Sequence, residues 1–411
     1  EGAVGAGCHH ILMVVLFLAH VVLAFGLAIS WWQDEGSDLT GKIKEFYDEE
    51  VETFRFVEKV MGYTALASLL YLLLFYVLLR ACATFFIIGS QLLLVATLFA
   101  IGGAALYDAT QEEATEDEIL AGLFGGVACL FGALVLLWLC CNWRMVQATG
   151  NMVARVSRIL TNQPTTLIVQ FVLTAAAAGW LLVVFSGTLE AVLLVPDPDN
   201  ATDEFDLTDS EYSAAVVGIV LYGVLILFWG ALVITNVSVV TTCGVVGTWY
   251  HSPSSLDAGL PLCKPAVWGA LRKACTSFLG SIALGSLLLA VVRTVIVAVR
   301  HLAHKLGQES CVCKFICCCC LCCLGCCESI MEWLSEYAYA YMAVYGTPFV
   351  TSGYRVVKIM ASSGMTAISQ TFLTTTVMHF GAALGAAVGA VVGYLCLLLP
   401  AEAEARRATG P

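Results

Sequence analysis

The chain has 411 residues, of which 60% are hydrophobic and only 12% are charged, and its mean hydropathy is +0.88. Soluble domains are roughly 45–50% apolar and about 25% charged, so an ordinary soluble protein is excluded. The formal net charge of -12 argues against a nucleic-acid partner, which needs a basic surface. We predict an all-α, polytopic transmembrane helical bundle that forms a single domain over residues 1–411.

Nine apolar stretches meet or approach the length of about 20 residues that a helix needs to cross a bilayer. In chain order they cover residues 11–32, 61–79, 82–106, 119–141, 166–195, 212–250, 277–299, 315–345 and 365–399. The sixth and the ninth are too long for one straight crossing, so each must tilt, protrude, break or hide a second pass. The sequence therefore predicts nine or ten spans.

The connections between these stretches alternate in charge. Those after the first, third and fifth hold nine, six and seven acidic residues, whereas those after the second, fourth and sixth are basic, with Arg80, Arg155 and Lys273 among them. Basic loops stay in the cytoplasm, so we expect the acidic loops outside a plasma membrane or in an organelle lumen. Acidic outer loops would attract cations, although depletion of basic residues alone gives the same asymmetry.

The acidic connection after the fifth stretch contains the triplet Asn200-Ala-Thr202. This triplet matches the acceptor pattern for N-glycosylation, which is used in loops that face a secretory lumen. We therefore predict a glycosylation site at Asn200.

Polar and aromatic side chains gather in the sixth stretch. Tyr222 and Trp229 lie seven residues apart and share a helix face, and Asn236, Trp249 and Tyr250 follow them. Polar groups inside a span need partners and often line a cavity. A quaternary ammonium ion cannot donate hydrogen bonds, so proteins hold it against Trp and Tyr faces. These five residues are candidates for such a pocket, and helix contact with an interfacial Trp-Tyr belt is the alternative.

Two later stretches carry ridges of small residues. Ser277, Ser281 and Gly285 recur at four-residue spacing, and the ninth stretch has three overlapping GxxxG units from Gly381 to Gly393. Such ridges let helices approach closely and also permit the sliding that alternating access requires. We expect helix contact at both ridges and include Ser281 as a polar neighbour of the pocket.

Three ionisable residues, Glu190, Arg293 and His379, lie within or near the ends of apolar stretches. Such residues are costly in hydrocarbon and often functional. His379 can titrate near neutral pH, so it is a second polar neighbour of the pocket, with a hydrogen-bonded structural histidine as the alternative.

Ten of the 19 cysteines fall within residues 311–327. The run is contiguous with an apolar stretch, where cysteine can pack as a small hydrophobe. We favour this packing, and acylation, disulfides and metal binding are the less favoured alternatives. No Walker A, GxSxG, HExxH or Rossmann glycine pattern occurs, so we predict no enzyme, catalytic residue, cofactor or metal site.

Four segments occur in series in the C-terminal half: Gly244-Val-Val-Gly-Thr-Trp-Tyr250, residues 270–288, the cysteine run and residues 337–349. In order and spacing they resemble the choline transporter-like family of membrane proteins. The resemblance implies ten spans, two cytoplasmic termini and transport of choline or a related amino-alcohol. The chain differs from the family pattern in its short first connection and in having no separate tenth span after Leu399.

The leading hypothesis is therefore a facilitative or proton-coupled membrane transporter of choline or a related organic cation. Its expected partners are this cationic small molecule and the lipid bilayer. The alternative is a structural or accessory subunit of a larger assembly that keeps the fold without transport. A protein that handles lipids is a third option.

Overall fold

The computed structural model describes residues 11–34, 51–111, 116–194, 214–252, 265–306 and 311–408. Every regular element in these ranges is a helix, which confirms the predicted all-α class. Seven of the described helices are long and apolar enough to cross a membrane. Asn200 and most residues of the acidic connections lie outside the described ranges.

The chain divides into two compact units. Unit 1 comprises Glu1–Phe46 and Gln163–Ala361, and unit 2 comprises Tyr47–Asn162 and Ser362–Pro411. The last helix, α11 (Phe349–Ala408), therefore starts in unit 1 and continues in unit 2.

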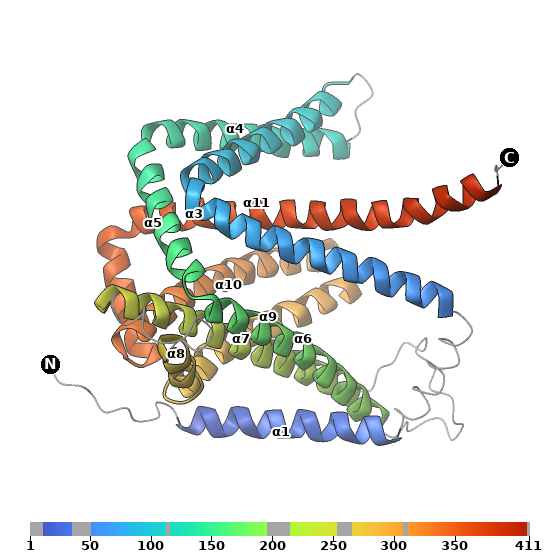
Figure 1. The fold of residues 1–411 in the computed structure, drawn as a ribbon, viewed down its shortest axis with the longest axis vertical. Helices are drawn as coiled ribbons and strands as arrows, with labels where there is room; N and C mark the ends of the chain where they lie inside the picture. Colours follow the sequence, from blue (N-terminus) through green and yellow to red (C-terminus); the bar gives the residue numbers. More distant parts are fainter. Residues whose placement is uncertain are drawn as a thin grey trace. The chain divides into compact units, whose positions relative to one another are not determined.

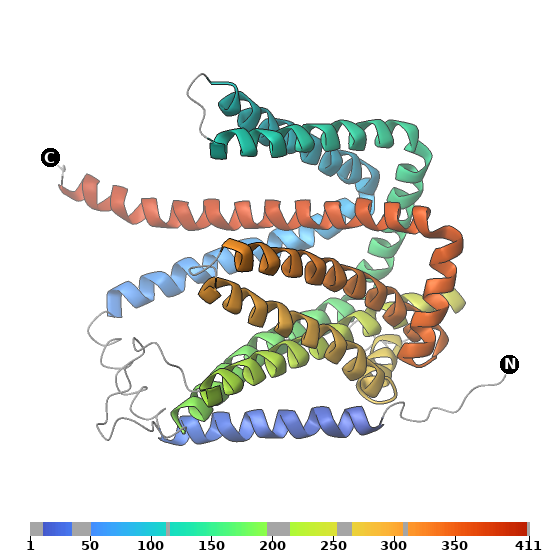
Figure 2. The same ribbon diagram turned by 180° about the vertical axis from the view of Figure 1, so that it is seen from behind.

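Unit 1 is centred on α7, which contacts α6, α8, α9 and α10. Figures 1 and 2 both show α9 and α10 side by side. The helices of this unit are α1 (Ile11–Asp34), α6 (Pro164–Leu193), α7 (Ala214–His251), α8 (Pro265–Cys275), α9 (Leu279–Leu306), α10 (Cys311–Tyr345) and the first turns of α11. Because α7 is one continuous helix of 38 residues, the long sixth stretch does not break into two helices.

The core of unit 1 forms where α7, α9 and α10 meet. Trp229, Val233, Val237 and Val240 recur every three or four residues, so they share the face of α7 that enters this core. They pack with Ala283 and Ile282 of α9 and with Tyr339 and Met342 of α10. Many large apolar side chains elsewhere on these helices are exposed, as expected where helices face lipid.

Unit 2 contains α3 (Val51–Ala109), α4 (Glu116–Cys141), α5 (Trp143–Thr161) and the remainder of α11. α3 bends at Cys82, which has the non-helical torsions φ -134 and ψ 36, and this bend separates the second and third apolar stretches. In α11 the only non-helical residue is Ser363. The ninth stretch lies beyond that bend, so it is one helix and not two passes.

Glycines make room for neighbouring helices in unit 2. A Cβ at Gly102 would lie 2.6 Å from the carbonyl oxygen of Gly125, so α3 and α4 cross with their backbones almost touching. In α11, a Cβ at Gly381 would lie 2.3 Å from the ring of Phe75, and one at Gly385 would lie 3.0 Å from the ring of Tyr71. The glycine ridge of the ninth stretch is therefore a contact surface for α3, as its spacing predicts.

Two short amphipathic helices, α5 and α8, occupy what the hydropathy pattern indicates only as basic connections. The buried residues of α5 include Val146, Thr149, Gly150 and Ser157, which lie on one face. A search for long apolar runs passes over such helices, because their apolar residues are periodic and not contiguous.

Candidate functional site

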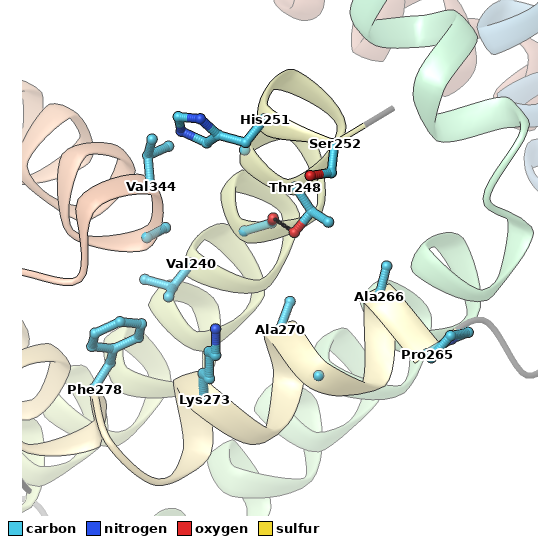
Figure 3. Close-up of a pocket in the computed structure, with 14 residues that line it drawn as sticks. Val240, Thr248, His251, Ser252, Pro265, Ala266, Ala270, Lys273, Phe278 and Val344 are labelled. Atoms are coloured by element: carbon cyan, nitrogen blue, oxygen red, sulfur yellow. Dashed lines mark hydrogen bonds between the residues drawn. The ribbon is translucent and has the colours of Figure 1, made fainter. Parts of the chain in front are cut away.

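A cavity of about 400 Å³ lies in unit 1 at the C-terminal end of α7 (Figure 3). Its walls come from α7, α8 and the end of α10, with Phe278 from the turn before α9. The described residues that line it include Val240, Gly244, Gly247, Thr248, His251, Ala270, Lys273, Phe278, Ala343 and Val344. Its volume falls in the range of cavities that hold small molecules.

Two glycines of α7 bring the walls together. A Cβ at Gly244 would lie 3.1 Å from the Cβ of Ala270 on α8, and one at Gly247 would lie 3.1 Å from the Cγ2 of Val344 on α10. Gly269 of α8 also lines the cavity, and a Cβ there would have nothing within 4 Å. Larger residues at these positions would separate the helices or fill the space.

The described residues that line the cavity include basic side chains and no acidic ones. Lys273 and His251 are the titratable groups among its described lining residues, and none of those residues is acidic. Figure 3 shows the Lys273 side chain extending from α8 toward α7. The Thr248 hydroxyl donates a hydrogen bond to the Gly244 carbonyl at 2.8 Å. A cation would therefore be repelled by Lys273 if it rested beside it.

A buried polar cluster joins α7, α9 and α10. On α7 and α10 it lies one helical turn from the cavity, toward the N-terminal end of each helix. Asn236 lies four residues before Val240, and Tyr339 lies four residues before Ala343. The Asn236 Nδ2 donates to Ser286 Oγ at 2.9 Å and to the Tyr339 hydroxyl at 3.4 Å. That hydroxyl donates in turn to the Ile282 carbonyl at 3.3 Å. Asn236 thus finds the partners that a polar group in a span requires.

Ser281 supports the start of α11. Its side chain is fully buried, and its Oγ accepts a hydrogen bond from the Phe349 N–H at 3.4 Å. The Phe349 ring lies 5.1 Å from the Tyr339 ring, measured between centroids. Ser281 is therefore next to the polar cluster, on the α9 side.

Tyr222 and Trp229 meet α1. The His20 ring lies 5.8 Å from the Tyr222 ring and 5.2 Å from the Trp229 ring, so the two aromatic residues share a face as predicted. Phe17 also contacts Trp229 at 5.3 Å, and the indole N–H of Trp229 donates to the Ala283 carbonyl at 2.9 Å. Neither residue lines the cavity, and the ring of Trp229 is already surrounded by protein.

The other predicted site residues lie away from the cavity wall. Trp249 and Tyr250 stand between Thr248 and His251 in sequence, yet only the latter two line the cavity. Tyr250 is 74% exposed. His379 is exposed and belongs to unit 2, whereas the six other predicted residues belong to unit 1.

The sequence interpretation did not single out several residues that the structure brings into the site. Lys273 enters that interpretation only through its charge, and His20 does not enter it. Phe278 and Val344 enter it only as members of the runs 270–288 and 337–349. Tyr339 lies inside the quoted run of residues 337–349, so that motif was the available signal.

Further polar contacts tie the helices of unit 1 together. Gln170 of α6 hydrogen-bonds Ser238 and Thr242 of α7. Glu190 of α6 is 5% exposed and accepts a hydrogen bond from Ser30 at 3.0 Å. These contacts hold α6 against α7 and α1.

Arg293 of α9 forms ion pairs with two carboxylates of α10. Its Nε lies 2.8 Å from Glu328, and its Nη2 lies 3.0 Å from Glu332. Among the residues that the structure describes, no group of three or more His, Cys, Asp or Glu could hold a metal ion. Cys319, Cys320, Cys323, Cys326 and Cys327 of the α10 run are free thiols.

Comparison with known proteins gives one family. The sequence model of the family described as plasma-membrane choline transporter matches residues 126–406. Protein PNS1 of Yarrowia lipolytica is 28% identical over 268 residues, which are 63% of this chain and 45% of that protein. Protein PNS1 of Candida glabrata is 23% identical over 383 residues, which are 90% of this chain and 64% of that protein. Protein PNS1 of Saccharomyces cerevisiae is 26% identical over 252 residues, which are 59% of this chain and 45% of that protein. The chain thus covers less than two thirds of each of these relatives.

Proposed function

Because the chain belongs to the plasma-membrane choline transporter family, we propose that this integral membrane protein moves choline or a related organic cation across its membrane. The family match confirms the resemblance that the four sequence segments indicate. The acidic connections would face outside or into a lumen and raise the local concentration of cations there.

The proposal rests on the convergence of three family-like segments at one cavity. The run from Gly244 to Tyr250 supplies Gly244, Gly247 and Thr248. Residues 270–288 supply Ala270, Lys273 and Phe278, and residues 337–349 supply Ala343 and Val344. Segments far apart in the chain thus build one space of about 400 Å³, which is large enough for a small organic cation.

The cavity serves as a vestibule, and the cation rests beyond it. Lys273 disfavours a cation in the cavity itself, because like charges repel even at moderate screening. One helical turn deeper, the rings of Tyr339 and Phe349 offer the aromatic faces that a quaternary ammonium ion prefers. The Asn236 cluster closes that position in this structure. Its hydrogen bonds must break for a path to open. Gly285 of α9 lies directly against the side chains of Tyr339 and Phe349, and this close contact gives α9 a surface along which to slide.

Uptake of radiolabelled choline into proteoliposomes tests the proposal. Gly269→Leu should fill the cavity without a backbone clash, because a Cβ there has nothing within 4 Å. We expect saturable uptake by the wild type and at least a severalfold lower rate in this variant. Gly353→Leu is the matched control, since Gly353 is also helical, has equally open surroundings and does not line the cavity.

Trp249→Ala, measured beside them, tests the pocket predicted from the sequence alone. If folded wild-type protein transports no more choline than empty vesicles, the transporter proposal is wrong and the accessory-subunit alternative is favoured. If Gly269→Leu and Gly353→Leu behave alike, transport does not use this cavity.

A further inference from the structure

The amphipathic helix α5 connects two helices that are candidates for crossing the membrane. α4 ends at Cys141 and α6 begins at Pro164, and both are long and apolar enough to span a membrane. α5 fills the interval from Trp143 to Thr161, so its ends lie within a few residues of the two spans. Its 19 residues cover about 28 Å. We infer that a helix tied so closely to two such spans lies along the membrane surface.

One face of α5 packs against the protein. Val146 belongs to the core cluster that contains Phe75 and Leu373. A Cβ at Gly150 would lie 2.2 Å from the Oγ1 of Thr84, so the backbone of α5 rests on α3 at that point. The exposed residues on the rest of the helix are therefore free to meet the membrane.

The exposed arc of α5 has a basic part and an apolar part. Arg144, Arg155 and Arg158 are exposed, and at 100° per residue they fall within an arc of about 60°. Beside them, Met152 is 57% exposed and Val156 is 38% exposed. Arginines next to exposed apolar side chains on a surface helix are typical of helices that lie in the headgroup layer of a membrane.

The arginines of this surface have no carboxylate partner in the described part of the chain. The ion pairs found there join Arg293 to Glu328 and Glu332, far along the chain in unit 1. Arg80, next to the bend of α3, adds a fourth positive charge, because its Nη1 lies 3.5 Å from the Thr161 hydroxyl at the end of α5. Four guanidinium groups therefore remain available for an external anion.

We propose that α5 and Arg80 bind the phosphate groups of anionic phospholipids in the leaflet on which α5 lies. A guanidinium group donates paired hydrogen bonds to phosphate oxygens, which favours this anion. Met152 and Val156 would enter the acyl layer beneath the headgroups, so a lipid suits this surface better than a soluble anion does. If the basic connections are cytoplasmic, this is the leaflet that carries anionic lipids. The inference does not depend on transport.

Lipid titration of the purified full chain in neutral detergent tests this proposal. The probes are dioctanoyl-phosphatidylserine, dioctanoyl-phosphatidylcholine and phosphoserine, and binding is measured by microscale thermophoresis. We expect phosphatidylserine to bind most tightly, with an affinity that falls as salt increases. Arg144→Gln, Arg155→Gln and Arg158→Gln together should weaken it, by about fivefold for each arginine lost.

Two controls separate this surface from general attraction to charge. Changing the same three arginines to lysine keeps the charges but removes the paired hydrogen bonds, so binding should fall to a level between the wild type and the triple glutamine variant. Arg300→Gln, an exposed site on α9, should change nothing. If the triple variant does not fold, Arg155→Gln alone should still weaken binding about fivefold. Equal binding of both lipids, unchanged binding by the glutamine variants, or equally tight binding of phosphoserine would each overturn the proposal.

Discussion

Lys273 shows how one side chain can determine the use of a cavity. It lines the space between α7, α8 and α10, where no described lining residue is acidic. A transporter of cations with a lysine in its vestibule should hold its substrate weakly there and release it readily. The same charge would slow the return of substrate into the cavity, because the two positive charges repel each other.

Lys273→Gln is therefore expected to lower the KM for choline about two- to fivefold, with kcat changed little. This is the effect of removing about 1 kcal/mol or less of repulsion in a hydrated cavity. Concentration-dependent uptake in proteoliposomes measures both constants. Arg272→Gln is the matched control, because Arg272 is the exposed neighbour of Lys273 on α8 and does not line the cavity. Equal changes in both variants would show that only the general surface charge matters.

Individual helices are positioned by the glycines at their crossings. Gly102 of α3 faces the backbone of Gly125 on α4, with no room for a methyl group. Its neighbour Gly103 points into open space. Because a backbone cannot rotate out of the way as a side chain can, α3 and α4 would have to separate to admit a Cβ at position 102.

Gly102→Ala should consequently destabilise the protein by about 1–3 kcal/mol, which is typical of overpacking. Gly103→Ala should be neutral or stabilising by up to about 1 kcal/mol, because alanine favours a helix over glycine. Unfolding in detergent by heat or denaturant measures both variants against the wild type. Similar stability of the two variants would contradict the close crossing of α3 and α4.

At the scale of the whole molecule, the alternation of acidic and basic connections determines the expected orientation. Twenty-two of the 31 acidic residues fall in the three acidic connections. The structure adds that the basic connections after the fourth and sixth stretches contain α5 and α8. α5 begins directly after the candidate span α4, and α8 ends shortly before the candidate span α9. Surface helices with exposed arginines or lysines fit the cytoplasmic side of a membrane.

Glycosylation at Asn200 gives a direct test of this orientation. In a eukaryotic host, we expect an endoglycosidase to reduce the apparent mass of the wild type. Thr202→Ala should remove the shift, whereas Thr202→Ser keeps the acceptor pattern and should retain it. Glycosylation of an acceptor triplet placed within residues 253–264, a connection that we expect on the opposite side, would contradict the orientation.

The sequence by itself determined the helical class and the family. A span must satisfy its own backbone hydrogen bonds and present apolar side chains to lipid, so its signal is local and contiguous. The pairing of Tyr222 with Trp229 on one face also follows from helical spacing alone. The amphipathic helices α5 and α8 carry a local signal as well, but a periodic one.

Only the tertiary structure decided which residues line the cavity. Thr248 and His251 line it while Trp249 and Tyr250 between them do not, because each residue turns a helix face by about 100° and the position of the neighbouring helix selects the face. Likewise, the sequence indicates that Asn236 needs a hydrogen-bond partner inside a span. Only the structure shows that its partners are Ser286 and Tyr339, which come from two other helices. Contacts between segments far apart in the chain depend on how the helices pack, which no local pattern encodes.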